Sequence, residues 1–208
     1  MTDPCRRAAR IADVELSEIL IISEVAAAMK AAGHDVISLG TGEPDFPTPT
    51  PVVDAAYKAA LGGATTYTAT VGTPALRQAI AEACQRENGF KPSLSEIIVC
   101  SGAKQVLYNA FCATLDAGDE VLITAPYWTS YPDIISVCGG KSVALPTSAA
   151  TEFRITPDQL RAAITPRTKW LILCSPSNPT GAAYTESELK ALAAVLMKHP
   201  QVHILSDD

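Results

Sequence analysis

The chain has 208 residues and a formal net charge of −6, with 48% hydrophobic and 18% charged residues. This composition excludes an intrinsically disordered chain, because a sequence of this length and apolar content can bury a sizeable core. The acidic balance disfavours a nucleic-acid partner, and no apolar run approaches the roughly 20 residues that cross a bilayer, which disfavours a membrane protein.

The first residues mix acidic and basic side chains without a following apolar stretch, so no secretory signal is predicted. The six cysteines form no C-x-x-C pair and lie mostly in apolar periodic segments, which favours buried thiols over disulfides or zinc ligands. The histidines have no carboxylate or second histidine at ligand spacing, so no metal site is predicted. We therefore expect a cytoplasmic protein.

The N-terminal part is predicted to hold a helix over residues 12–33 and a short strand, VISLG, over 36–40. The loop TGEPDFPTPTP (41–51) follows, and its prolines indicate a linker or a wall of a binding site. A boundary near residue 46 would divide an N-terminal segment, 1–45, from a main domain, 46–208.

Helices and strands alternate from Thr73 onward. Thr73 is a candidate N-cap, Pro74 suits the first helical position, and Gly89 ends that helix. The predicted strands are 96–101 (EIIVCS), 120–124 (EVLIT), 141–145 (KSVAL), 169–174 (KWLILC) and 202–206 (VHILS). The predicted helices are 103–115, 129–138, a short helix opened by the Thr156 to Gln159 capping box, and one from Thr185 to about Lys198. The pattern predicts an α/β fold, with a mostly parallel sheet covered by helices on both faces.

Ligands of such sheets bind beyond the carboxyl ends of the strands, and polar residues follow several of these strands. Gly102-Ala103-Lys104 opens a helix and suits an anion, although an ordinary turn would look the same and no Walker A spacing is present. Asp207 ends a strand, where a carboxylate binds magnesium, pairs with a cation, or is simply solvated.

Two further strand ends carry an aromatic ring and an amide. Trp128 either covers a flat ligand or packs in the core, and Asn178 lies in the turn SPSNPTG, which two prolines and a glycine make rigid. Together the four strand ends offer an anion site, a flat face, an amide and a carboxylate. Pyridoxal 5′-phosphate has a phosphate, an aromatic ring, a phenolic oxygen and a basic nitrogen, and would use all four.

The motifs also carry a family resemblance. They are DVISLGTGEPDFPTP (35–49), YTATVGTPALRQAIA (67–81), SGAKQVLYNAF (101–111), AGDEVLITAPYWTSYPDII (117–135), SPSNPTG (175–181) and ILSDD (204–208). In this order they resemble the fold-type I pyridoxal-phosphate enzymes, specifically the class I aminotransferases of the bacterial aspartate aminotransferase kind. The resemblance covers nearly the whole chain from residue 14.

The resemblance implies specific roles. Backbone N–H groups of Gly102, Ala103 and Lys104 would bind the cofactor phosphate, and Tyr67 would reach a phosphate held by a neighbouring subunit, which implies a homodimer. Trp128 would stack on the pyridine ring, Asn178 would bind its O3′ atom, and Asp207 would pair with the protonated ring nitrogen. Gly42 would offer its N–H to the substrate carboxylate, at a site that Trp128 and Asn178 also line.

Two departures from the family pattern are visible. Ala103 stands where the family tends to have glycine, which would weaken the phosphate site if that position needs a positive φ. None of the eight lysines matches the context of the family's Schiff-base lysine, and the arginines that bind substrate are missing. We therefore expect an incomplete large domain, inactive by itself, preceded by part of a small domain, in which the strand VHILS leaves an unpaired edge.

The implied activity is the transfer of an amino group between an α-amino acid, aspartate-like or aromatic, and a 2-oxo acid such as 2-oxoglutarate. A lyase or decarboxylase of the same fold would have the same cofactor site. A transcriptional regulator built on this fold would need a basic winged-helix segment, for which residues 1–45 offer neither length nor charge. A non-catalytic remnant is the fourth alternative, because it would not need the lysine.

Overall fold

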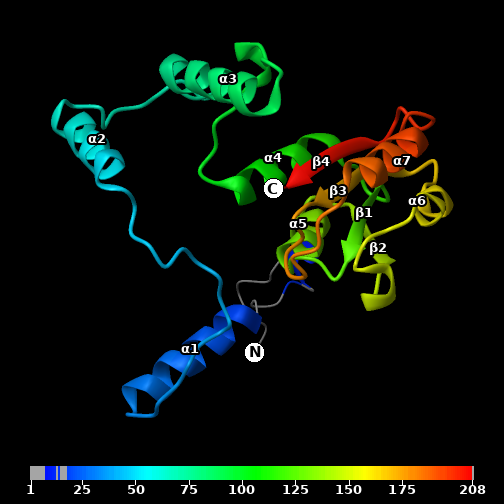
Figure 1. Cartoon of the computed structure of the whole chain (residues 1–208), viewed down its shortest axis with the longest axis horizontal. Helices are drawn as coiled ribbons and strands as arrows, with labels where there is room; N and C mark the ends of the chain where they lie inside the picture. The colour runs from blue at the N-terminus through cyan, green and yellow to red at the C-terminus, as the bar shows by residue number, and fades with distance from the viewer. Residues whose placement is uncertain (1–7, 13, 15–17, 208) are drawn as a thin grey trace. The chain divides into compact units, whose positions relative to one another are not determined.

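The computed structural model (Figure 1) describes residues 8–12, 14 and 18–207, and its contacts divide them into two units. One unit is Glu18–Val106. The other runs from Leu107 onward and includes the described residues before 18. This division does not test the predicted domain boundary near residue 46, which stays a prediction.

The second unit contains a four-stranded sheet with the order β2-β1-β3-β4, and all three strand pairs are parallel. The strands are β1 (Glu120–Ala125), β2 (Lys141–Pro146), β3 (Thr168–Cys174) and β4 (His203–Asp207). The predicted α/β class and the four later strands are thus confirmed. In the described part of the chain β4 lies at the edge of the sheet, as expected for VHILS.

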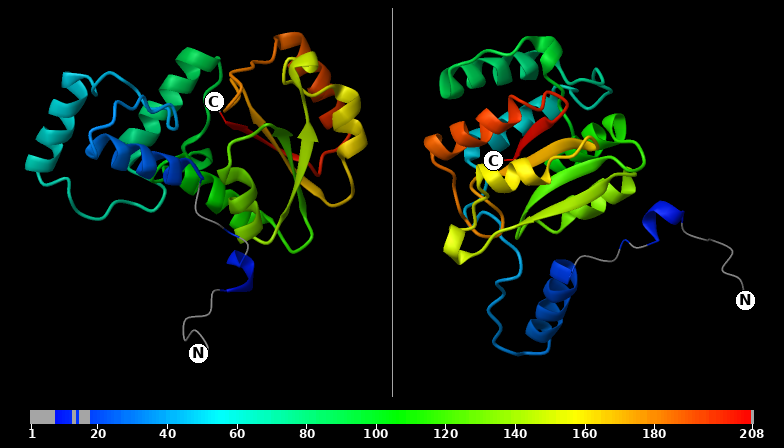
Figure 2. Two further views of the ribbon diagram at one scale, coloured as in Figure 1. Left: turned by 90° about the horizontal axis from the view of Figure 1, so that it is seen from below. Right: turned by 90° about the vertical axis from the view of Figure 1, so that its right-hand side faces the viewer.

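Helices cover both faces of this sheet. On one face, α4 (Ala103–Thr114) contributes Phe111 and α5 (Ser130–Val137) contributes Ile135 to a core with Ile123 and Ile172. On the other face, α6 (Pro157–Ala163) and α7 (Glu186–Leu196) pack against a core that includes Leu171; Figure 2 shows these two helices side by side in yellow and orange. Side chains alternate along each strand, so each strand contributes residues to two separate cores, one on each face of the sheet.

Two helices of the sheet unit, α6 and α7, begin at caps that the sequence encodes. Thr156 accepts a hydrogen bond from the Gln159 N–H (3.2 Å), and the Gln159 side chain accepts one from the Thr156 N–H (2.9 Å). Thr185 and Glu188 repeat this arrangement at α7. Each capping box satisfies N–H groups that have no partner within the helix, so these boundaries follow from local sequence.

The unit Glu18–Val106 is helical in the structure. It contains α1 (Glu18–Ala31), α2 (Thr50–Leu61), α3 (Pro74–Asn88) and the short 3-10 helix η2 (Leu94–Glu96). The predicted start and end of α3 are confirmed, because Thr73 accepts the Leu76 N–H (3.3 Å) and Gly89 adopts a left-handed φ of 77°. The remaining 3-10 turns, η1 (Ala9–Ile11) and η3 (Ala149–Thr151), belong to the sheet unit.

Two predicted strands are wrong, and one helix was missed. Residues 36–40 and 96–101 contain no strand. Ile37 and Leu39 are 85% and 91% exposed, so the apolar run 36–40 has no neighbour to pair with, and a strand needs such a ladder partner. The missed helix is α2. The helix predicted over 12–33 appears as α1, while residues 13 and 15–17 at its expected start lie outside the described residues.

The cysteines are less buried than predicted. Four of the five described cysteines are half-buried and Cys112 is exposed; Cys5 lies outside the described residues. None of the described helices combines the length and the hydropathy that a membrane-spanning segment needs. Among the described residues, no three His, Cys, Asp or Glu side chains gather as metal ligands would.

Candidate functional site

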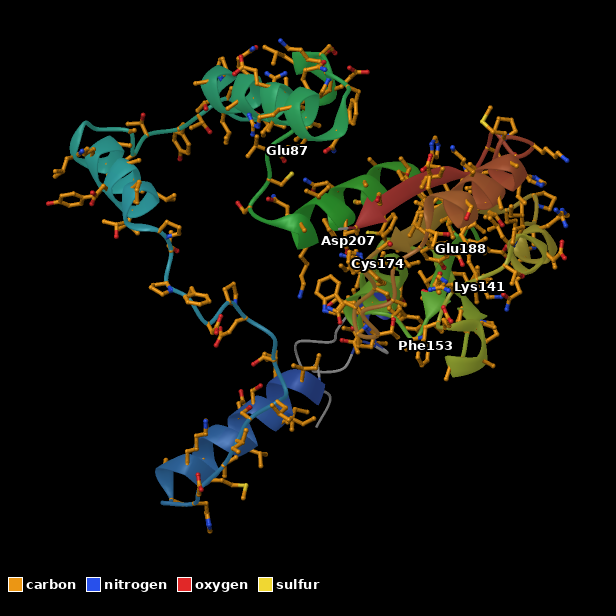
Figure 3. The ribbon with its side chains drawn as sticks, viewed as in Figure 1. Glu87, Lys141, Phe153, Cys174, Glu188 and Asp207 are labelled. Atoms are coloured by element: carbon orange, nitrogen blue, oxygen red, sulfur yellow. The ribbon has the colours of Figure 1, made fainter. Side chains whose placement is uncertain are left out.

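The carboxyl ends of β3 and β4 bring two polar side chains together. Cys174 and Asp207 are paired across the two strands (Figure 3). Ile172 lies two residues before Cys174 and belongs to the core under α4 and α5. Because side chains alternate along a strand, Cys174 and Asp207 point to that same face of the sheet.

Tyr131 of α5 joins this pair from the face above. Its hydroxyl donates a hydrogen bond to Oδ2 of Asp207 and lies in contact with the Cys174 thiol. Its ring meets Trp128 edge to face, with 5.4 Å between ring centroids and 90° between ring planes. Tyr131 therefore connects two of the residues that the sequence assigned to the cofactor, Trp128 and Asp207.

Tyr131 keeps its phenol proton and so remains a hydrogen-bond donor to Asp207. Burial is the main cause that raises the Tyr131 pKa well above its ordinary value of 10.0, and the hydrogen bond to Asp207 and the neighbouring Cys174 thiol raise it further. Only 2% of the residue is exposed. The phenol therefore stays neutral across the physiological pH range, and Asp207 receives a hydrogen bond without receiving a positive charge.

The turn after β3 holds Asn178 beside the same groups. The Asn178 N–H donates to the Cys174 sulfur (3.4 Å), and the turn is closed by the Gly181 N–H donating to the Ser177 carbonyl (2.7 Å). Tyr131, Cys174 and Asn178 line a small cavity of about 10 Å³, room for a single water molecule. The cis peptide bonds are Ala125–Pro126, Ser175–Pro176 and Asn178–Pro179.

The remaining predicted site residues lie in the other unit. Gly102 has a φ of 94°, whereas Ala103 has no positive φ and begins α4. The left-handed position thus falls on the glycine, so the concern that alanine strains this turn is wrong. A Cβ on Gly42 would meet nothing within 4 Å, and Tyr67 is fully exposed.

The structure thus places Trp128, Asn178 and Asp207 in the sheet unit, and Gly42, Tyr67, Gly102, Ala103 and Lys104 in the unit Glu18–Val106. The three residues of the sheet unit fit a cationic aromatic ring. Asp207 offers a carboxylate whose partner is a neutral phenol, Trp128 offers an indole, and Asn178 offers an amide. A protonated pyridine nitrogen is the kind of group that such a carboxylate binds.

Sequence reasoning missed Tyr131 and Cys174. Tyr131 follows Trp128 by three residues, the spacing that places two side chains on one side of a helical turn. Cys174 is the last residue of its strand, and the parallel register makes it the cross-strand neighbour of Asp207. Strand alternation, combined with the correct register, was the signal that could have found Cys174.

Comparison with known proteins identifies the family of the chain. The family described as Aminotransferase class I and II matches residues 34–208. The aspartate/prephenate aminotransferase of Cereibacter sphaeroides is 54% identical over 95% of this chain and 50% of its own length. The aspartate aminotransferase of Rhizobium meliloti is 54% identical over 98% of this chain and 50% of its own.

Solved structures of aspartate aminotransferases also match nearly the whole of this chain. The crystal structure of the Rhizobium meliloti aspartate aminotransferase has a TM-score of 0.94 at 53% identity and covers 98% of this chain and 51% of that one. The Thermus thermophilus aspartate aminotransferase with maleate has a TM-score of 0.93 at 41% identity, over 98% and 53%. The chain spans about half the length of the curated relatives it matches.

These similarities confirm the predicted enzyme family and its cofactor, because class I and II aminotransferases depend on pyridoxal 5′-phosphate. The structural match includes the parallel sheet that carries Trp128, Asn178 and Asp207. The chain belongs to the class I and II aminotransferases.

Proposed function

We propose that the protein carrying this chain transfers an amino group between an α-amino acid, aspartate-like or aromatic, and a 2-oxo acid such as 2-oxoglutarate. The observation that carries this proposal is Asp207, a carboxylate at a strand end whose partner is the neutral phenol of Tyr131. The names of the relatives, which include aspartate and aspartate/prephenate aminotransferases, support both substrate types. Maleate in the Thermus thermophilus structure supports a dicarboxylate.

In this proposal each residue has one task. When bound, pyridoxal 5′-phosphate supplies an electron sink for the charge that develops at the substrate α-carbon. Asp207 holds the proton at the ring nitrogen, Trp128 covers the ring and excludes water, and Asn178 donates a hydrogen bond to the O3′ oxygen.

Backbone N–H groups would bind the cofactor phosphate and the substrate carboxylate. N–H groups of Gly102, Ala103 and Lys104, where α4 begins, suit the cofactor phosphate, since a helix start offers N–H groups without helical partners. The N–H of Gly42 would bind the substrate carboxylate. No lysine of this sequence has the context of a lysine that binds the cofactor covalently, so the proposal assigns none within this chain.

We further propose a homodimer in the cytoplasm. Full exposure of Tyr67 supports its assignment to a phosphate held by a second subunit. The cysteines, which form no C-x-x-C pair, support a reducing compartment. The aminotransferase names of the relatives speak against the lyase, regulator and remnant alternatives.

The test is Asp207→Asn, with Asp133→Asn as the matched control, because Asp133 is an exposed carboxylate on α5 of the same unit. The protein carrying this chain is loaded with pyridoxal 5′-phosphate, and amino transfer from aspartate to 2-oxoglutarate is followed together with cofactor retention. Asp207→Asn is expected to lower kcat by at least about 100-fold, and cofactor affinity much less, because the lost charge acts on the developing transition state. Turnover equal to that of Asp133→Asn would refute the proposal.

A further inference from the structure

Tyr131 contacts three residues at the carboxyl end of the sheet. Its hydroxyl contacts Asp207 at the end of β4 and Cys174 at the end of β3, and its ring contacts Trp128. Asp207 and Cys174 are themselves cross-strand neighbours. One hydroxyl group therefore ties together two strand ends and the helix α5.

We propose that Tyr131 is the positioning residue of Asp207: its hydroxyl, held in place by Cys174, fixes the carboxylate in the orientation in which it meets the ring nitrogen of the cofactor. This inference rests on the proposed function, and it assigns a role to a residue outside the predicted cofactor-binding set.

The hydrogen bond from Tyr131 restricts how the Asp207 carboxylate can turn. A carboxylate has two oxygens, and Tyr131 occupies Oδ2 of Asp207. A donor fixed at one oxygen restricts rotation of the carboxylate and directs the other oxygen. Because Tyr131 is 2% exposed and its ring packs against Trp128, the hydroxyl has almost no freedom to move away.

Cys174 restricts the same hydroxyl from a second side. The Cys174 thiol contacts the Tyr131 hydroxyl, accepts the Asn178 N–H (3.4 Å) and donates to the Pro176 carbonyl (3.4 Å). The turn that carries Asn178 is thereby connected to the group that orients Asp207. A displacement of the turn that carries Asn178 would therefore also move the Tyr131 hydroxyl.

The competing explanation is that Tyr131 only fills the core beneath α5. Phenylalanine keeps the ring and removes the hydroxyl, so Tyr131→Phe separates the two explanations. Tyr184→Phe is the matched control, because Tyr184 lies in the same unit and its hydroxyl also makes a hydrogen bond, accepted from the Ile155 N–H (3.0 Å), but does not contact Asp207.

The experiment uses the protein carrying this chain, loaded with pyridoxal 5′-phosphate labelled with ¹⁵N in the ring, and NMR at neutral pH. The ¹⁵N signal reports protonation of the ring nitrogen independently of turnover. Tyr131→Phe is expected to move the signal toward that of the unprotonated ring and to lower kcat about tenfold at nearly unchanged KM, as for loss of one hydrogen bond to a charged group. Tyr184→Phe is expected to leave the signal in place, and thermal unfolding shows whether the two variants are equally folded.

A second variant keeps the inference testable if Tyr131→Phe does not fold. Cys174→Ala retains the phenol but frees its hydroxyl, so we expect a smaller displacement of the ¹⁵N signal in the same direction. A signal unchanged in Tyr131→Phe but displaced in Asp207→Asn would overturn the positioning role and leave the proposed function intact. A signal that Asp207→Asn also leaves unchanged would instead refute the proposed function, and this inference with it.

Discussion

The buried carboxylate of Glu120 at the start of β1 allows a quantitative prediction about the sheet. Glu120 is 4% exposed; the Thr165 hydroxyl donates to its Oε2 (2.5 Å) and Arg167 Nη2 donates to its Oε1 (3.0 Å). The Arg167 side chain is 67% exposed, so solvent weakens its ion pair to roughly 0.5 kcal/mol. A hydrogen bond to a buried charged group is worth about 2 kcal/mol, which makes Thr165 the more important partner.

We therefore predict that Thr165→Val lowers the free energy of unfolding by about 2 kcal/mol, and that Arg167→Met lowers it by about 0.5 kcal/mol. Valine retains the shape of threonine, so the loss reports the missing hydroxyl, which donates to Glu120 and also accepts the Arg167 N–H (3.1 Å). Urea unfolding of the cofactor-free protein at pH 7, followed by circular dichroism, measures both values. A larger loss in Arg167→Met than in Thr165→Val would show that charge, and not the buried hydroxyl, stabilises Glu120.

The pH dependence provides an independent check of the same reasoning. The Thr165 hydrogen bond, followed by the Arg167 contact, lowers the pKa of Glu120 below its ordinary value of 4.5, against the opposing effect of burial. A lowered folded-state pKa stabilises the protein above that ordinary value, and the stabilisation is lost as the pH falls through the folded-state pKa. The difference between wild type and Thr165→Val should therefore be full at pH 7 and shrink below about pH 4. A difference that stays constant down to pH 3 would contradict the assignment.

Two further predictions concern packing in the two units. Leu171→Ala, in a fully buried position of the central strand β3, should cost about 2 to 5 kcal/mol of unfolding free energy in urea titrations, and exposed Leu189→Ala on α7 should cost far less. Gly72→Ala should destabilise the unit Glu18–Val106 by about 1 to 3 kcal/mol, seen as faster limited proteolysis, because φ is 97° and a Cβ would lie 2.7 Å from Val99 Cγ2. Gly63→Ala shares the positive φ of 86° but meets nothing within 4 Å, so a loss as large as that of Gly72→Ala would disprove the clash.

The sequence by itself determined the elements whose signals are local. The start of α3 at Thr73 and its end at Gly89 follow from side-chain and backbone preferences within a few residues. The capping box at Thr156 likewise predicts α6. The continuous apolar runs of β1 and β3 predicted buried strands, because each strand is covered by a helical layer on both faces.

The motifs also determined which chemical groups to look for. Trp128 and Asn178 follow strands and Asp207 ends one, and strands of a parallel sheet end at one edge, so their convergence on one edge of one unit was predictable from order alone. The assignments to individual cofactor atoms remain predictions.

Only the tertiary structure decided the features that depend on a partner distant in sequence. Residues 36–40 and 96–101 have the composition of strands but no strand beside them, and strand formation requires hydrogen bonds from a neighbour that the local sequence does not specify. The contact of Tyr131 with Asp207 spans 76 residues and depends on how α5 packs on β3 and β4. Local preferences set where elements begin and end; packing between elements sets which side chains meet, and that is why the partner of the predicted cofactor carboxylate emerged from the fold alone.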